Sequence, residues 1–169
     1  MATVTAPNRS FVGWLFIVGG ALQVVGAIVG FANVGNAGAI YAISNIAIGS
    51  AFVLLLAWFA PTTIARVAYF IAALGWLLLA LTSLVNLGAI GSVATYIAIV
   101  GCVFAGVIVL TGHPFGALAD ILFFVAMVLG AIELLMSQNS NVPGFLKGFV
   151  VVLFGGFLVA SAALILRRR

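Results

Sequence analysis

Six apolar runs, each about 20 residues long, constrain this chain more than any other feature of its sequence. An α-helix rises ~1.5 Å per residue, so a run of this length crosses the ~30 Å of hydrocarbon in a bilayer. The runs do not alternate apolar and polar residues, which argues against membrane β-strands. The sequence therefore predicts an all-α membrane protein whose six transmembrane helices are Phe11–Asn33, Ala39–Ala60, Ile64–Asn86, Ser92–Thr111, Gly116–Met136 and Leu146–Leu166.

The scarcity of charge supports this prediction and excludes several functions. Only 5% of the residues are charged, whereas a soluble domain carries about 25%. The links are short, the longest being Ser137–Phe145, so we expect one membrane domain over residues 1–169 and no soluble catalytic site. One histidine, His113, and one cysteine, Cys102, form no recognisable metal site or disulfide. We therefore expect no enzyme activity, no metal, no cofactor and no nucleic-acid partner, but contact with the lipid bilayer.

The basic residues predict how the chain is oriented in the membrane. With six crossings, Arg9, Arg66 and the run Arg167–Arg169 all fall on one side, and Lys147 alone falls on the other. Positive residues accumulate on the cytoplasmic side of a membrane. We expect both termini in the cytoplasm and the protein in the cell (inner) membrane.

Glycines recur in phase along the chain and suggest an internal repeat. Gly20, Gly75 and Gly130 are 55 residues apart, in the first, third and fifth runs. The sequence thus predicts three tandem helical hairpins, at about residues 11–60, 64–111 and 116–166, arranged with pseudo-threefold symmetry. Because small residues let helices approach closely in lipid, we expect helix packing at Gly20, Gly26, Gly30, Gly49, Gly75, Gly101, Gly130 and Gly155.

Both acidic residues, Asp120 and Glu133, lie in the fifth run. Carboxylates inside a membrane are paired, hydrated or functional. One interpretation pairs Asp120 with Arg66 and Glu133 with Lys147, because each base lies at the matching depth. The other interpretation makes the two acids a proton or ion relay.

Further polar residues lie deeper in the runs. Gln23, Asn45, Thr82 and Ser83 either hydrogen-bond between helices or form a polar lining for a small solute. The candidate residues of such a path or polar interior are Gln23, Asn45, Asn86, Asp120 and Glu133.

Two groups of aromatic residues complete the candidate features. In such a path, Phe123 and Phe124 would form a constriction. The tryptophan and tyrosine residues that lie mostly toward the ends of the runs are expected at the membrane interfaces: Trp14, Trp58, Tyr69 and Trp76.

The hairpin pattern resembles two known families. Gly112-His113-Pro114-Phe115-Gly116 is similar to the Gly-Asn-x-Phe-Gly link of the acetate/succinate transporters, and Leu135-Met136 followed by Phe145-Leu146 fits their next hairpin. The chain departs from that family in its histidine, in the position of the link, and in lacking the Asn-Pro-x-Pro-Leu-Gly motif, near which only Ala6-Pro7-Asn8 stands. The pattern also resembles the acid-resistance membrane proteins of the HdeD type. The transporter resemblance, which the proton-gated urea channels share, implies a ring of subunits with a path through each.

Two functions follow as hypotheses. The chain is a channel or transporter for a small solute such as a short carboxylate, working as a homo-oligomer. Alternatively, it is a non-transporting stress protein or an accessory subunit of a larger membrane complex. The first hypothesis requires a continuous polar path and the second a dry helix bundle.

Overall fold

The computed structural model describes residues 9–33, 36–85 and 88–167, and its regular structure there is entirely helical. The predicted six helices are confirmed, and no end differs from its predicted position by more than three residues. Each helix is long and apolar enough to span a membrane. Their bounds are α1 Arg9–Ala32, α2 Ala37–Trp58, α3 Thr63–Leu84, α4 Ala89–Gly112, α5 Ala117–Ser137 and α6 Gly144–Arg167.

Short polar or glycine-containing links end the helices. The side chains of Asn36 and Thr62 accept hydrogen bonds from the first-turn amides of α2 and α3, as N-cap residues do. Helix α4 ends at Gly112, and its C-cap residue His113 adopts a left-handed conformation with φ of 49°. Pro114 follows it, so the chain cannot continue as a helix and turns into α5.

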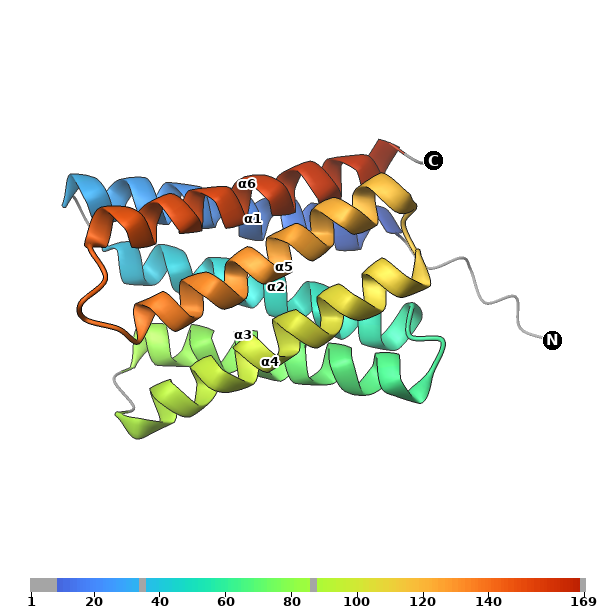
Figure 1. The fold of residues 1–169 in the computed structure, drawn as a ribbon, viewed down its shortest axis with the longest axis horizontal. Helices are drawn as coiled ribbons and strands as arrows, with labels where there is room; N and C mark the ends of the chain where they lie inside the picture. Colours follow the sequence, from blue (N-terminus) through green and yellow to red (C-terminus); the bar gives the residue numbers. More distant parts are fainter. Residues whose placement is uncertain (1–8, 34–35, 86–87, 168–169) are drawn as a thin grey trace.

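The six helices form a closed ring. Each helix packs against its neighbours in chain order, α1 packs against α6, and no other helix pair makes backbone contact among the described residues. In Figure 1, α4, α5 and α6 form a front layer over α1, α2 and α3. The described ends of the chain lie at one end of the bundle, which we call the terminal end, and the opposite end is the distal end.

Glycines bring neighbouring helices of the ring into close contact. A Cβ atom added at Gly75 would collide with Ala98 on α4, and one added at Gly101 would collide with Ala72 on α3. Gly20 and Gly155 face each other in the same way and form the seam between α1 and α6.

The other glycines expected at helix contacts behave less uniformly. An added Cβ would lie 2.8 Å from Leu77 at Gly49, 2.8 Å from Tyr41 at Gly26 and 3.1 Å from Phe154 at Gly130. Gly30 differs, since nothing lies within 4 Å of such an atom.

These contacts do not repeat around the ring. Gly20 faces α6, the helix that precedes its own hairpin in the ring, whereas Gly75 and Gly130 face the second helix of their own hairpins. Spacing in the sequence does not decide which neighbour a glycine meets. The pseudo-threefold repeat of hairpins stays a prediction.

Aromatic side chains fill the ring around its middle and on the terminal side of the middle. Phe16, Phe52 and Phe123 come from α1, α2 and α5, and all are fully buried. Their ring centroids are 5.3 Å apart for Phe16 and Phe123, 5.5 Å for Phe16 and Phe52, and 6.1 Å for Phe52 and Phe123. Trp76 on α3 and Phe154 on α6 stack across the ring at 5.6 Å. We call these five side chains the aromatic layer, and they close the axis of the bundle.

Candidate solute-binding cavity

A polar cavity of about 170 Å³ lies inside the ring on the distal side of the aromatic layer. It lies on the bundle axis, because its walls come from α1, α2, α3 and α5, and of these α5 contacts none of the others through the backbone. We call it the axial cavity, and its lining residues are Gln23, Tyr41, Asn45, Trp76, Leu79, Ser83, Glu133 and Leu134.

Two amide side chains form the inner end of the axial cavity, which we call its floor. The Nε2 atom of Gln23 on α1 donates a hydrogen bond of 3.1 Å to Oδ1 of Asn45 on α2. Both side chains are buried, at 4% and 6% exposure. One turn farther along α2, toward the terminal end, Ile48 packs against Gly19, so apolar atoms lie directly behind the floor. The amide pair is therefore the polar floor of a cavity whose surroundings are apolar.

Glu133 is the only acidic or basic residue in this lining. It lies on α5, is half-buried, and forms no ion pair within the described part of the chain. The pairing with Lys147 that matched depth suggested is not formed. Depth along the membrane does not fix the direction of a side chain, and Glu133 faces the bundle axis with residues of α1, α2 and α3.

Exposure increases from the floor of the cavity toward the distal end. Trp76, Gln23 and Asn45 are buried, Tyr41 and Glu133 are half-buried, and Ser83 near the end of α3 is exposed. In the other direction, the stack of Trp76 on Phe154 closes the cavity. The axial cavity is therefore a blind pocket that opens toward the distal end.

The second acid, Asp120, belongs to a different part of the bundle. It is fully buried at the terminal end, where its Oδ1 accepts a 3.1 Å hydrogen bond from the backbone N–H of Phe115. Its Oδ2 lies 3.5 Å from Nδ1 of His113 and makes no hydrogen bond. This contact is the only ion pair among the described residues, and it is ionic only while the imidazole is protonated.

The predicted pair of Asp120 with Arg66 is not formed either. Arg66 is exposed on the outside of α3, whereas Asp120 points inward to the α4–α5 link. The carboxylate instead holds together the link that carries His113 and Phe115. Asp120 and Glu133 thus face separate regions and do not form one relay.

Of the five residues expected to line a path, the structure brings Gln23, Asn45 and Glu133 together around the axial cavity. Asp120 lies at the other end, and Asn86 lies outside the described residues.

Aromatic residues of the axial cavity, Trp76 and Tyr41, were not expected there from the sequence. Trp76 and Tyr69 were expected at the membrane interface, but both are 1% exposed and face inward. Trp14 and Trp58 are exposed, as that expectation requires. Trp76 directly follows Gly75, and Gly75 faces α4. A glycine at a helix contact indicates which side of α3 faces its neighbours, so its position could have predicted that Trp76 points into the bundle.

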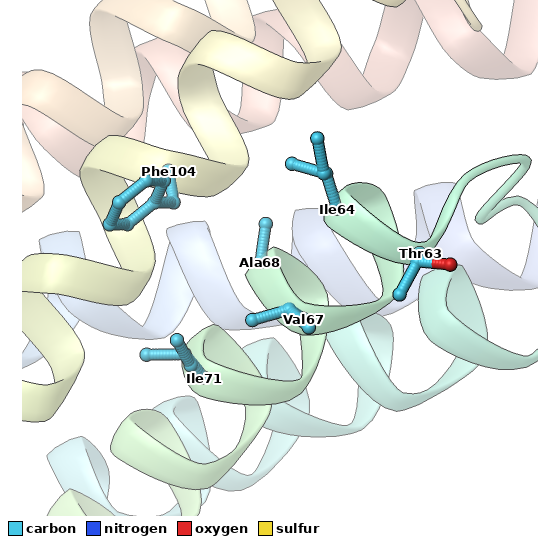
Figure 2. Close-up of a pocket in the computed structure, with 6 residues that line it drawn as sticks. All are labelled: Thr63, Ile64, Val67, Ala68, Ile71 and Phe104. Atoms are coloured by element: carbon cyan, nitrogen blue, oxygen red, sulfur yellow. The ribbon is translucent and has the colours of Figure 1, made fainter.

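Two further hollows formed by the described residues are almost entirely apolar. The groove in Figure 2 has a volume of about 190 Å³ and lies where α3 and α4 diverge. Phe104 of α4 faces the side chains of Ile64, Val67 and Ile71 across it, and the Thr63 hydroxyl is the only polar side-chain group at its rim. This groove has the character of a lipid-facing surface and holds no group for solute recognition.

The fold defines the class of the protein: a closed ring of six helices, each long and apolar enough to cross a membrane, with a blind polar cavity at one end. No known protein family, no curated protein and no solved structure matches the chain.

Proposed function

We propose that this chain is a multi-pass membrane protein that binds a small solute in the axial cavity and carries it across the bilayer. The observation that carries the proposal is the convergence of Gln23, Asn45 and Glu133 on one cavity inside an otherwise apolar bundle. Polar residues inside a membrane are costly and typically mark a binding site or an ion pathway. A cavity that four helices build is a common form of such a site.

The basic residues support an orientation for this carrier. Arg9, Arg66 and Arg167 lie at the terminal end, and Lys147 lies at the distal end. By the positive-inside rule, the terminal end faces the cytoplasm of a cell (inner) membrane. The axial cavity then opens to the outer side, and its solute enters from there.

The aromatic layer favours a carrier over an open channel. Rings from α1, α2, α3, α5 and α6 fill the axis, so no continuous polar path runs through the bundle. A carrier that exposes its site to one side at a time is closed on the other side in each state. In this proposal the aromatic layer is the closed gate, and the structure corresponds to the outward-open state.

The cavity fits a short carboxylate poorly. Its only charged side chain is itself a carboxylate, and like charges in an apolar surrounding repel each other strongly. We therefore do not extend the resemblance to acetate transporters to the choice of solute.

The test is uptake by proteoliposomes of labelled acetate, urea and methylammonium, each measured separately. We expect uptake of at least one solute above that of empty liposomes. Asn45→Leu should abolish this uptake, because it removes the polar floor of the cavity. Asn141→Ala is the matched control, since it removes an exposed amide of the α5–α6 link. No uptake of any of the three solutes would overturn the proposal of transport.

A second candidate is a non-transporting protein, either a stress protein or an accessory subunit of a membrane complex. The aromatic side chains in the terminal half of the bundle favour it, because the buried rings of Phe16, Phe52 and Phe123 block the axis there. Binding of a solute at the axial cavity without uptake into liposomes would favour this candidate over the carrier.

A further inference from the structure

The electrostatics of the axial cavity indicate the class of its ligand. Glu133 is one of two acids in the chain, and no described lysine, arginine or histidine pairs with it. It also lies one turn before the C-terminal end of α5, the end of a helix that disfavours negative charge. A positive charge nearby would stabilise a carboxylate in these surroundings. The described part of the chain places no basic side chain there, so a positively charged ligand could take that role.

The neighbouring side chains of the cavity suit an organic cation. Tyr41 and Trp76 line the same space, and aromatic faces attract ammonium groups, tryptophan most strongly. The indole N–H of Trp76 makes no hydrogen bond of acceptable geometry, and the Cys102 thiol beside it is a weak acceptor. One face of the Trp76 ring stacks on Phe154, and the remaining surface of the ring lines the cavity.

The size of the cavity limits the ligand. Its volume of about 170 Å³ is close to that of the ~150 Å³ cavity known to hold one benzene molecule. A small molecule of this size fits, whereas a peptide or a phospholipid headgroup with its glycerol does not. The exposed Ser83 places the entrance at the distal end.

We propose that the axial cavity binds a small organic cation of the ammonium class, with its charge at Glu133 and its carbon atoms against Trp76 and Tyr41. This inference rests on the proposed solute-binding function and specifies its ligand.

The experiment compares three probes on the purified full chain in detergent by isothermal titration calorimetry. Tetramethylammonium is the cation, tert-butanol is a neutral molecule of nearly the same size and shape, and acetate is the anion. We expect tetramethylammonium alone to bind. Glu133→Gln, which keeps the size of the side chain and removes its charge, should weaken binding by about tenfold or more, because it removes the negative charge that attracts the cation. Glu133→Asp should retain part of the affinity.

Melting temperatures of the variants separate loss of binding from loss of fold, and Asn141→Gln is a control outside the cavity. Binding of tetramethylammonium that Glu133→Gln leaves unchanged in a folded protein would overturn the inference. Displacement of the probe by sodium at equal concentration would also overturn it, because the site would then select charge and not an organic cation. Binding of tert-butanol or acetate that Asn45→Leu abolishes would overturn the cation class and leave the proposed solute site standing. If none of the three probes binds, the solute site itself fails.

Discussion

Gln23 and Asn45 are 22 residues apart in the sequence and join α1 to α2 through a buried 3.1 Å hydrogen bond between their side-chain amides. Both amides also line the axial cavity, so they connect the two helices and give the cavity a polar surface. The chain thereby satisfies part of the hydrogen-bonding capacity of two groups that are costly in an apolar bundle. The remainder is available to a solute.

This pairing predicts energetic coupling between the two residues. Gln23→Leu and Asn45→Leu should each lower the free energy of unfolding, because each leaves the other amide without its partner. The double variant should lose less than the sum of the two, with a coupling of about 0.6 kcal/mol and at most about 1.7 kcal/mol, the range for interhelical bonds in membranes. Unfolding by SDS, followed by circular dichroism, measures the cycle. Strict additivity would show that water in the cavity replaces the bond.

The contact of Gly101 with Ala72 predicts a local sensitivity to volume. Gly101→Ala places a methyl group against the α3 backbone, so α3 and α4 must separate. We expect a loss of about 1–3 kcal/mol in the free energy of unfolding, typical of overpacking. Gly156→Ala is the control, because it adds the same methyl group in mid-helix where nothing lies within 4 Å. Equal effects of the two variants would contradict the close approach of α3 and α4.

Asp120 is expected to stabilise the α4–α5 link mainly through the backbone N–H of Phe115. Asp120→Ala leaves that buried donor unpaired, which should cost about 1–3 kcal/mol. His113→Asn removes the imidazole but tolerates the left-handed conformation, and we expect it to cost less than about 1 kcal/mol because the imidazole is exposed. Thermal unfolding in detergent compares them. An effect of His113→Asn as large as that of Asp120→Ala would assign the stability to the ion pair.

Chemical labelling of introduced cysteines tests the orientation of the chain in the membrane. Cys102 is fully buried, so Cys102→Ala provides a background without thiols. Asn141→Cys then marks the distal end, and Thr111→Cys marks the terminal end, at exposed positions. A membrane-impermeant maleimide added to whole cells should label the first and not the second. The reverse pattern would place the terminal end and its arginines outside.

The sequence predicted positions along the membrane well and directions around each helix poorly. The six spans follow from the lengths of the apolar runs, because the bilayer sets how long a helix must be. These helices are apolar on nearly every side, so no polar face shows which way a residue points. Trp76 was therefore expected at an interface, whereas it lies on the bundle axis.

For the candidate site, too, the sequence predicted which residues are unusual but not the directions in which their side chains point. Gln23, Asn45 and Glu133 were recognised as unusual because they are polar in apolar runs, but their convergence depends on how α1, α2 and α5 are rotated. Arg66 and Asp120 were matched by depth, but Arg66 is exposed on the outside of α3, whereas Asp120 is buried against the α4–α5 link. The contact of Asp120 with His113 depends on the turn after α4, whose left-handed residue no pattern in the sequence indicated.

The seam at Gly20 and Gly155 has a consequence for biosynthesis. Since α1 finds one of its two neighbours only in α6, five further helices must leave the ribosome before its glycine face is covered. During that interval the nascent chain is an open arc, and its polar interior is accessible sideways to lipid. Closure of the arc, and with it the completion of a shielded interior, is therefore a late event that depends on α6.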